Sequence, residues 1–424
     1  MNSCKSCLSK EKCNSKSKRS VQTYGREGEP DSLPEITSAF LVVTQACNLK
    51  CKYCFVVQKP RSMTLKTAKD AADYLATNAK ERGEIPSINF FGGEPLLKWK
   101  DVIVPLTYYI RQKYGDNFEL SMTTNGVLLD EEKLQFMKKN KIGFMVSIDG
   151  NKKTQDINRP CADGRSSFDI IAPKIAMFLR YNPNMTFRAT VDHDNVEEYL
   201  NNHKFAVEHG YTNMFSIVNV FSKWSEPEKN ELEKQIHLTA EYYLDLLYEG
   251  KNFSMSPFES MFRKIDKIKE AERKNEFRTA GKGLLAYGRC GLGASKFASI
   301  GTDGTLYSCQ EMSDNDEIGR EFIIGDIYKG TNKNRRMNII KKFDPKKVHS
   351  TDDMDCKKCP FYRICDGACT INNYFANGDL NIMPSILCFY YQCLYREAVQ
   401  IRKTAEQFEN VVERFRNKGI LKRK

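Results

Sequence analysis

Apolar and polar residues follow two periods along the chain, and these periods predict alternating strands and helices. Residues 39–44 form a short apolar run that is typical of a buried strand, and between 64 and 79 apolar residues recur at helical spacing. The two patterns then repeat as far as residue 218. They predict further strands at 87–91, 119–123, 143–148, 186–191 and 213–218, and further helices at 96–111, 131–139, 167–179 and 196–208.

Six strand–helix units in about 180 residues predict a parallel sheet that curls into a partial barrel. Parallel strands need a crossover connection, and the helices between the predicted strands supply it. We therefore expect an α/β fold with a partial (β/α)6 TIM-like barrel over residues 37–225. Active sites in such barrels lie in the loops that follow the strands, so these loops are the first place to look for chemistry.

The remainder of the chain divides by composition and pattern. Residues 1–36 are a polar, Cys-containing extension, and 226–280 are a helical linker with helices expected at 226–248 and 258–274. Residues 281–393 contain few long periodic segments, so we expect metal rather than an apolar core to hold this region together. Residues 394–424 are predicted to contain a closing helix at 397–416.

Three cysteines directly after the first predicted strand carry the strongest chemical signal. Cys47, Cys51 and Cys54 have the spacing C-x3-C-x2-C. Soft thiolates suit iron–sulfur clusters, and three of them hold three irons of a [4Fe–4S] cube while the fourth iron stays open to a small molecule. A structural zinc site needs four ligands, and no fourth Cys or His lies close by. The spacing therefore favours a catalytic cluster.

Composition indicates the cellular compartment of the protein and the kind of partner that it binds. The chain has 424 residues and 15 cysteines, with no apolar signal segment and no apolar run long enough to span a membrane. Cysteines in such a chain indicate metal binding in a reducing cytoplasm rather than disulfides. The net charge of +12 favours an acidic partner, such as a peptide with an acidic leader. The Lys and Arg residues are scattered among acidic ones, so we expect no nucleic-acid partner, and most are explained by a solvated surface.

Three further motifs follow the next three predicted strands in order. They are Gly92-Gly93-Glu94-Pro95, Thr124-Asn125-Gly126 and Ser147-Ile148-Asp149-Gly150. Together with the three cysteines, they resemble the radical S-adenosylmethionine (radical SAM) superfamily. The resemblance implies that the amino and carboxylate groups of SAM chelate the open iron. One electron from the cluster then cleaves the sulfonium and gives a 5′-deoxyadenosyl radical.

The resemblance also implies which residues contact SAM. The glycine-rich motif would meet the amino group, the turns after the third and fourth strands would meet the carboxylate and the ribose, and an aromatic after the last cysteine would pack near adenine. Arg159 is a candidate partner of the SAM carboxylate, with Arg188 as a weaker one, although a surface ion pair explains Arg159 equally well. The candidate SAM-binding residues are Phe55, Gly92, Gly93, Glu94, Pro95, Thr124, Asn125, Ser147, Asp149 and Arg159.

A second set of cysteines lies in the C-terminal part of the chain. It consists of Cys290-x13-Gly304-x4-Cys309, then Cys356-x2-Cys359-x5-Cys365-x3-Cys369, and finally Cys388. A zinc ribbon explains one C-x2-C pair but not this ladder. The pattern resembles the seven-cysteine SPASM domain of radical SAM enzymes that modify peptides and proteins. The resemblance implies two auxiliary [4Fe–4S] clusters, the distal one on Cys356, Cys359, Cys365 and Cys388, and the proximal one on Cys290, Cys309 and Cys369.

The chain departs from the sulfatase-maturing members of this group at two places. Those relatives have an extra cysteine shortly after the first one, and none lies between Cys290 and Cys309 here. They also carry an Asp catalytic base directly after the second cysteine, where this chain has Gln310. Both departures count against formylglycine chemistry. A proximal cluster with three protein thiolates keeps an open iron for a substrate thiolate, unless Cys393 or another group fills the position.

Three cysteines near the N-terminus repeat part of this spacing. Cys4-x2-Cys7-x5-Cys13 is either a further metal site, completed by Cys161, Cys393 or a partner, or a tail with incidental thiols. Cys161 has no local partner and is expected to be a loop or buried thiol. The stretch before Cys47 is short and polar for a leader-binding domain, so we expect leader recognition to use a separate protein or a basic surface.

The sequence as a whole predicts a cytoplasmic radical SAM/SPASM enzyme that forms thioether cross-links in a ribosomally synthesised, Cys-rich precursor peptide. The resemblance is to sactipeptide and ranthipeptide maturases, and it implies an electron donor such as flavodoxin or ferredoxin. An alternative is C–C (cyclophane-type) cross-linking or another peptide oxidation. A sulfatase-maturase-like activity and a non-catalytic metal-binding scaffold with an acidic partner are less favoured alternatives. The fold by itself does not fix the substrate.

Overall fold

A computed structural model of the chain describes residues 33–277, 291–351, 355–405, 407, 408, 413 and 415. These residues belong to one compact unit, Leu33–Lys424. Cys4, Cys7, Cys13 and Cys290 lie outside the described residues, so the predictions made for them stay predictions. No helix in the described ranges is long and apolar enough to cross a bilayer.

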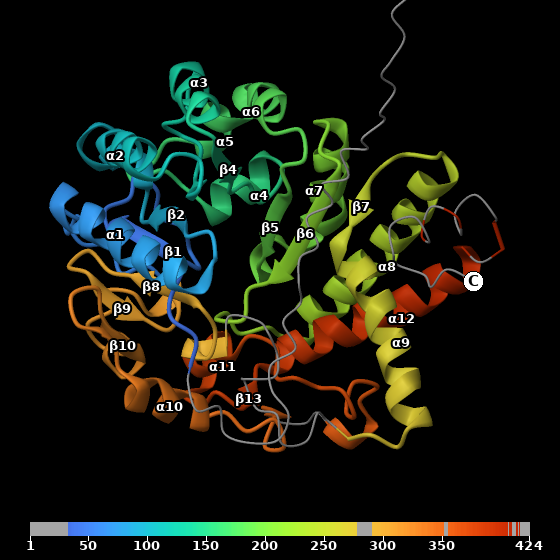
Figure 1. Cartoon of the computed structure of the whole chain (residues 1–424). Coiled ribbons are helices and arrows are strands. Elements are labelled where there is room, and N and C mark those ends of the chain that lie inside the picture. Colours follow the sequence, from blue (N-terminus) through green and yellow to red (C-terminus); the bar gives the residue numbers. More distant parts are fainter. Residues whose placement is uncertain are drawn as a thin grey trace, which may run out of the picture. The chain divides into compact units, whose positions relative to one another are not determined.

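The first half of the chain forms the expected parallel strands (Figure 1). Strands β1, β2, β3 and β4 are neighbours in chain order, and every pair is parallel. Buried side chains alternate with more exposed ones along β2 and β3, because successive residues of a strand point to opposite faces, whereas β1 is buried at every position from Leu41 to Thr44. The bounds are β1 Ser38–Thr44, β2 Ser87–Gly92, β3 Glu119–Thr124 and β4 Ile142–Val146. The α/β fold class with a partial TIM-like barrel is thus confirmed.

The remaining barrel strands form a second parallel sheet, β5 (Phe187–Val191), β6 (Asn213–Val218) and β7 (Ser254–Met255). No backbone ladder joins β4 to β5 among the described residues. Side chains that follow β4 bridge the gap instead. The Asp149 carboxylate accepts from the Thr190 N–H of β5 at 3.1 Å, and the Asn158 amide donates to the Thr190 carbonyl at 2.8 Å.

The helices cover this sheet largely where the pattern placed them, with local breaks at prolines. The expected helix at 96–111 is a 3₁₀ turn, Pro95–Lys98, then a π turn, Trp99–Ile103, and only then α2. The expected helix at 167–179 is divided in two at Pro173, whose ring removes a helical hydrogen bond. The bounds are α1 Leu65–Arg82, α2 Val104–Tyr114, α3 Glu131–Lys139, α4 Lys152–Asn158, α5 Ser167–Ile171, α6 Ile175–Tyr181 and α7 Tyr199–Glu208.

The C-terminal region continues the barrel sheet instead of standing apart from it. β8 pairs in parallel with β1, and β9, β10 and β11 extend the same sheet by antiparallel pairing. Phe322, Ile324 and Ile339 are buried there. The expectation of a region without an apolar core is therefore wrong. The strands are β8 Phe297–Ile300, β9 Thr305–Tyr307, β10 Ile323–Asp326, β11 Gly330–Thr331, β12 His349–Ser350 and β13 Ile382–Met383.

The closing helix begins earlier than its sequence pattern suggested. It starts at Ser385 rather than near residue 397, so it carries Cys388 and Cys393. Its buried face, which includes Leu387, Tyr390 and Leu394, packs against α8 and α9 (Figure 1). The other helices are α8 Glu226–Tyr248, α9 Ser256–Arg273, α10 Lys333–Lys341, α11 Thr370–Asn377 and α12 Ser385–Ala405.

One buried imidazole makes the stability of the fold depend on pH. His203 on α7 is 1% exposed, and its Nδ1 lies 2.7 Å from the Tyr199 carbonyl oxygen. Burial lowers the pKa of His203 from 6.5 to about 4. Below pH 6.5 the unfolded chain takes up a proton that the folded chain does not, so stability falls as the pH drops.

We expect the wild-type protein to lose about 3 kcal/mol of stability between pH 6.5 and pH 4 through His203 alone. An H203Q variant should lack this component. Urea unfolding of both proteins across this pH range gives the slope of the free energy of unfolding against pH for each of them. Parallel slopes would contradict the assignment.

Candidate active site

The three cysteines after β1 lie in a loop that is held by backbone hydrogen bonds. Three bonds join this loop to the segment 158–162. Lys50 N–H donates to Pro160 O (2.9 Å), Lys52 N–H to Asn158 O (3.0 Å) and Ala162 N–H to Asn48 O (2.9 Å). The segment that carries the candidate Arg159 is therefore part of the scaffold of the cysteine loop. Cys161 is buried in this segment, beside Leu49, as a thiol in the packed loop.

The three thiols lie close enough to influence one another. Burial first, and then the neighbouring Glu94, Cys51 and Cys54, together raise the pKa of Cys47 to about 12. Burial likewise raises the pKa of Cys51 to about 11 and raises that of Cys54. Such thiols stay protonated until a metal displaces the proton, because metal binding and thiol deprotonation are coupled.

The glycine-rich turn after β2 packs directly on the cysteine loop. Gly93 N–H donates to Thr44 O at 2.8 Å, and Glu94 N–H donates to Ala46 O at 2.9 Å. A Cβ on Gly92 would lie 2.1 Å from Thr44 O, and one on Gly93 would lie 2.3 Å from Ala46 O. The sequence analysis expected these glycines to allow a close approach. In the structure, the group that they approach is the backbone leading to Cys47.

Glu94 ties two of the motif loops together. Its carboxylate is 0% exposed and accepts from Leu96 N–H (3.0 Å), Thr124 O–H (2.8 Å) and Asn125 N–H (2.8 Å). Burial raises the pKa of this carboxyl to about 7, against the lowering effect of its three donors. These contacts join the turn after β2 to the turn after β3, and the expected contact of the glycine-rich motif with the SAM amino group stays a prediction. Pro95 is buried and starts the 3₁₀ turn that follows.

Asn125 connects the turn after β3 to the cysteines. Its amide nitrogen lies 2.8 Å from the Asn48 side-chain oxygen and 3.8 Å from the Cys47 sulfur. Thr124 also receives the Gly126 N–H, and its carbonyl receives the Ser147 N–H, which links the third motif to the fourth. All four motif loops therefore meet at the carboxyl ends of β1 to β4.

Asp149 and Arg159 form a buried ion pair against the same loop. Asp149 is 0% exposed, and its Oδ2 lies 3.0 Å from the Arg159 Nε. Tyr53 donates its O–H to Asp149, and the Arg159 guanidinium lies over the Tyr53 ring and 3.9 Å from the Cys51 sulfur. Arg159, which the sequence offered as a partner of the SAM carboxylate or of a surface ion pair, is committed to a buried one.

Arg188 is a further cation at this site, and it has no acidic partner among the described residues. It lies on β5 with an exposed side chain, over the Phe215 ring, and forms no ion pair with the described residues. Partial desolvation of the Arg188 side chain by the surrounding protein, and then the neighbouring charge of Arg159, lower its pKa. Phe55 stacks on Phe91 at 6.1 Å between ring centroids, so core packing accounts for part of its surface.

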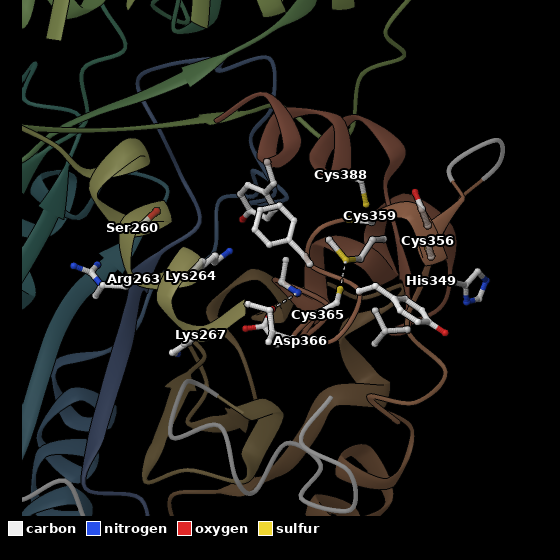
Figure 2. Close-up of a pocket in the computed structure, with 18 residues that line it drawn as sticks. Ser260, Arg263, Lys264, Lys267, His349, Cys356, Cys359, Cys365, Asp366 and Cys388 are labelled. Carbon is white, nitrogen blue, oxygen red and sulfur yellow. Dashed lines mark hydrogen bonds between the residues drawn. The ribbon is translucent and has the colours of Figure 1, made fainter. Parts of the chain in front are cut away.

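The second cysteine region brings four thiols to one cavity, which Figure 2 shows. Cys356, Cys359, Cys365 and Cys388 line a cavity of about 200 Å³, and all four are half-buried. Burial first, and then the three neighbouring cysteines, raise the pKa of Cys388 to about 12. They are the four residues that the resemblance assigned to the distal cluster. We call this space the four-thiol cavity.

The segment that follows Cys309 contacts the backbone leading to Cys47. The Gln45 amide donates to Asp314 O at 3.0 Å, and the Arg61 guanidinium binds the Asp316 carboxylate through two bonds of 3.0 Å. Cys309 itself is buried. The structure thus brings the Cys309 segment next to the Cys47 loop, a neighbourhood that the sequence did not reveal.

Sequence analysis missed Glu311 in this segment. One of its carboxylate oxygens is buried without a hydrogen-bond partner among the described residues, and burial raises its pKa to about 7. The side chain of Gln310 takes a different role, because its amide oxygen accepts from the Cys309 thiol at 3.6 Å. A single carboxylate in an otherwise ordinary loop gives no signal in the sequence.

Cys393 has surroundings different from those of the four-thiol cavity. It lies five residues after Cys388 on α12, about 140° around the helix axis. It is buried, and its sulfur receives an N–H from Arg396 at 3.3 Å. The sequence offered Cys393 as a fourth ligand of the proximal cluster, and because Cys290 lies outside the described residues, that assignment stays a prediction.

The donor sets fit iron–sulfur clusters better than single ions. Among the described residues, no three Cys, His, Asp or Glu side chains converge as the ligands of one ion. A cluster takes each thiolate on a different iron, so its ligands surround a volume rather than a point. Three thiols in one loop and four around one cavity match this requirement.

Comparison with known proteins identifies the domain that carries these motifs. Residues 41–236 match the family model described as the Radical SAM superfamily. The chain contains a radical SAM domain. It is a radical SAM enzyme, and the matched residues span all four motif loops from Cys47 to Asp149 as well as β5 and β6.

Relatives and solved structures extend the likeness into the C-terminal region. A cysteine-type anaerobic sulfatase-maturating enzyme of Clostridium perfringens is 23% identical over 357 residues, covering 80% of this chain and 89% of the relative. Native anSMEcpe with bound AdoMet and Cp18Cys peptide superposes with a TM-score of 0.66 at 19% identity, over 88% of this chain and 99% of that one. Streptococcus suis SuiB bound to precursor peptide SuiA superposes with a TM-score of 0.54 at 16% identity, over 84% and 76%. These superpositions establish a shared fold.

We expect an E94Q variant to lose about 1–3 kcal/mol of stability, because an amide N–H₂ would then face one of three donors that need an acceptor. A T124V variant removes one donor to Glu94 and the acceptor of the Gly126 N–H, but it keeps the carboxylate with its two backbone donors, so we expect a smaller loss of stability. Urea unfolding of the metal-free proteins measures both values. Wild-type stability in E94Q would show that Glu94 does not hold the two turns together.

Proposed function

We propose that this radical SAM enzyme is a SPASM-type peptide maturase that forms thioether cross-links, each between a Cys sulfur and a carbon, in a ribosomally synthesised Cys-rich peptide. The observation that carries the proposal is the contact between the Gln45 amide and Asp314. It places the segment after Cys309 against the backbone that leads to Cys47. A carbon near the first site and a sulfur near the second would then belong to one bound peptide.

The chain's own residues supply the positions for the cofactors. Cys47, Cys51 and Cys54 would hold the catalytic [4Fe–4S] cluster. The two auxiliary clusters would use the four-thiol cavity and the set Cys290, Cys309 and Cys369. When bound, the cluster and SAM supply a 5′-deoxyadenosyl radical, and the protein orients the substrate. The Asp149–Arg159 pair and Glu94 hold the cysteine loop in place.

The glutamine at position 310 favours cross-linking over formylglycine formation. In the sulfatase-maturing enzymes that this chain resembles, an Asp base follows the second cysteine, whereas a Gln amide takes up no proton at neutral pH. In thioether formation, the carbon loses a hydrogen atom, the thiol loses a proton, and one electron leaves as the C–S bond forms. A thiolate bound to an open iron of the proximal cluster would need no separate base at position 310.

Oxidation of a cysteine or serine in a protein substrate is the second candidate function. The similarity to a sulfatase-maturating enzyme over 80% of the chain favours it. C–C cross-linking remains an alternative within the peptide-modifying class, and a metal-binding scaffold is the non-catalytic one. A SAM-binding arrangement of four motif loops has no use in a scaffold. We further propose a cytoplasmic location and a flavodoxin- or ferredoxin-type electron donor.

SAM cleavage, product mass and thiol labelling together distinguish these functions. We expect reconstituted enzyme with dithionite to convert SAM to 5′-deoxyadenosine, and a C47A variant to form none. With a Cys-rich peptide encoded beside the gene, each product should lack two hydrogens and one iodoacetamide-reactive thiol per cross-link. Loss of two hydrogens with unchanged thiols would support C–C bonds if no aldehyde is present, and serine oxidation if an aldehyde-reactive hydrazide labels the product. Loss of the sulfur would support sulfatase-maturase chemistry, and absence of SAM cleavage would support the scaffold.

We also propose that Arg188, rather than Arg159, binds the SAM carboxylate. An R188A variant should bind SAM about 10- to 100-fold more weakly, as expected for the loss of a charged hydrogen bond. The control is R165A, because Arg165 is an exposed residue paired with Asp163. Equilibrium dialysis with labelled SAM measures the affinity. Unchanged affinity in R188A would contradict the assignment.

A further inference from the structure

The loop that carries the first three cysteines is closed at its base. The Gln45 N–H donates to Arg61 O at 3.0 Å, and Thr44 and Ser62 form an antiparallel bridge beside this bond. The Thr44 hydroxyl also donates to Arg61 O at 3.0 Å. Residues 45–61 therefore form a closed loop whose two ends lie together. We call these paired ends, Thr44 and Gln45 with Arg61 and Ser62, the neck of the cysteine loop.

The segment that follows Cys309 binds both sides of this neck. On the returning side, the Arg61 guanidinium donates to both carboxylate oxygens of Asp316 at 3.0 Å, and the Lys59 ammonium pairs with the same carboxylate. On the incoming side, the Gln45 amide donates at 3.0 Å to the backbone carbonyl two residues before Asp316. One carboxylate therefore receives two cations of the cysteine loop. We call Lys59, Arg61 and Asp316 the neck clamp.

The neck clamp lies at the surface, so it contributes little to the stability of the whole fold. The side chains of Lys59, Arg61 and Asp316 are 34%, 48% and 41% exposed. Exposed ion pairs stabilise a folded protein only weakly, but a bidentate Arg–carboxylate pair fixes the relative position of its two groups. Hydrogen bonds from Lys59 and Arg61 lower the pKa of Asp316 to about 2, so the clamp stays charged at neutral pH. Its loss should release the neck without unfolding the protein.

The two segments that the clamp joins belong to different sites of the proposed reaction. The cysteine loop carries the ligands proposed for the catalytic cluster, and Cys309 belongs to the set proposed for the proximal cluster. A carbon that loses its hydrogen near the first site has to lie next to a sulfur held near the second. Small errors in such a position cost large factors in rate. A fixed contact between the two segments therefore bears directly on bond formation.

We propose that Asp316 is a positioning residue that holds the cysteine loop against the Cys309 segment, so that hydrogen abstraction and C–S bond formation take place in one bound peptide. It acts through Lys59 and Arg61. Without it, SAM is still cleaved, but fewer cleavage events lead to a cross-link. The inference rests on the proposed function, because that function requires the two sites to work on the same peptide.

An exposed ion pair elsewhere in the chain provides a matched control. Asp116 pairs with Lys141, and the hydrogen bond from Lys141 lowers the pKa of Asp116 as it does at the clamp. Asp116 precedes β3, whereas the motif loops follow the strands. D116N and D316N therefore make the same chemical change at an unrelated place and at the clamp.

The first measurement needs no peptide. Hydrogen–deuterium exchange of the reconstituted proteins, followed by mass spectrometry, reports the opening of the neck directly. We expect the amides of residues 45–62 to exchange at least about threefold faster in D316N than in the wild type, and at the wild-type rate in D116N. K59A/R61A should match D316N, and adding D316N to it should change nothing further, because the same contact is already lost. Wild-type exchange in D316N, or additive effects, would overturn the clamp.

The second measurement compares 5′-deoxyadenosine with cross-links formed in the Cys-rich peptide encoded beside the gene. We expect D316N to produce about three- to tenfold more 5′-deoxyadenosine per cross-link, with SAM cleavage itself within about twofold of the wild type. High salt should raise this ratio in the wild type and not in D316N, because salt screens exposed charges. An unchanged ratio in D316N, or an equal rise in D116N, would overturn the positioning role. A wild type that forms no cross-links would contradict the proposed function, whereas the exchange measurement would still support or overturn the clamp.

Discussion

Two buried carboxylates, Glu94 and Asp149, determine the arrangement of the cysteine loop. An ionised carboxylate that leaves water must receive hydrogen bonds or pair with a cation, or its burial costs several kcal/mol. Glu94 takes its donors from its own turn and from the turn after β3. Asp149 takes its donors from Tyr53 in the cysteine loop, from Arg159 and from β5. Each acid therefore fixes several loops at once, and the thiols are positioned as a consequence.

The pairing of β8 with β1 has a comparable effect on a larger scale. It makes the C-terminal cysteine region a continuation of the barrel sheet. The segment after Cys309 consequently lies against Gln45, and the two cysteine regions share a rigid support. An enzyme that abstracts a hydrogen at one site and forms a bond at another needs such a fixed separation, because small errors in position cost large factors in rate.

The likeness to sulfatase-maturating enzymes and to SuiB concerns the scaffold, and the chemistry depends on a few residues placed upon it. In this chain the Gln310 amide oxygen accepts from the Cys309 thiol, and the neighbouring Glu311 has a buried oxygen without a partner among the described residues.

The sequence by itself determined the radical SAM motifs, the order of barrel strands and the four cysteines of the C-terminal cavity, because strand periodicity and ligand spacing are local patterns. It misjudged the core of the C-terminal region, because the short strands there become buried only by joining a distant sheet. It misjudged the start of α12, because this helix is buried against the distant helices α8 and α9. Only the tertiary structure decided that Arg159 pairs with Asp149 while Arg188 stays free of an ion pair with any described residue. Which partner a charge finds depends on contacts between remote segments, and no local pattern records them.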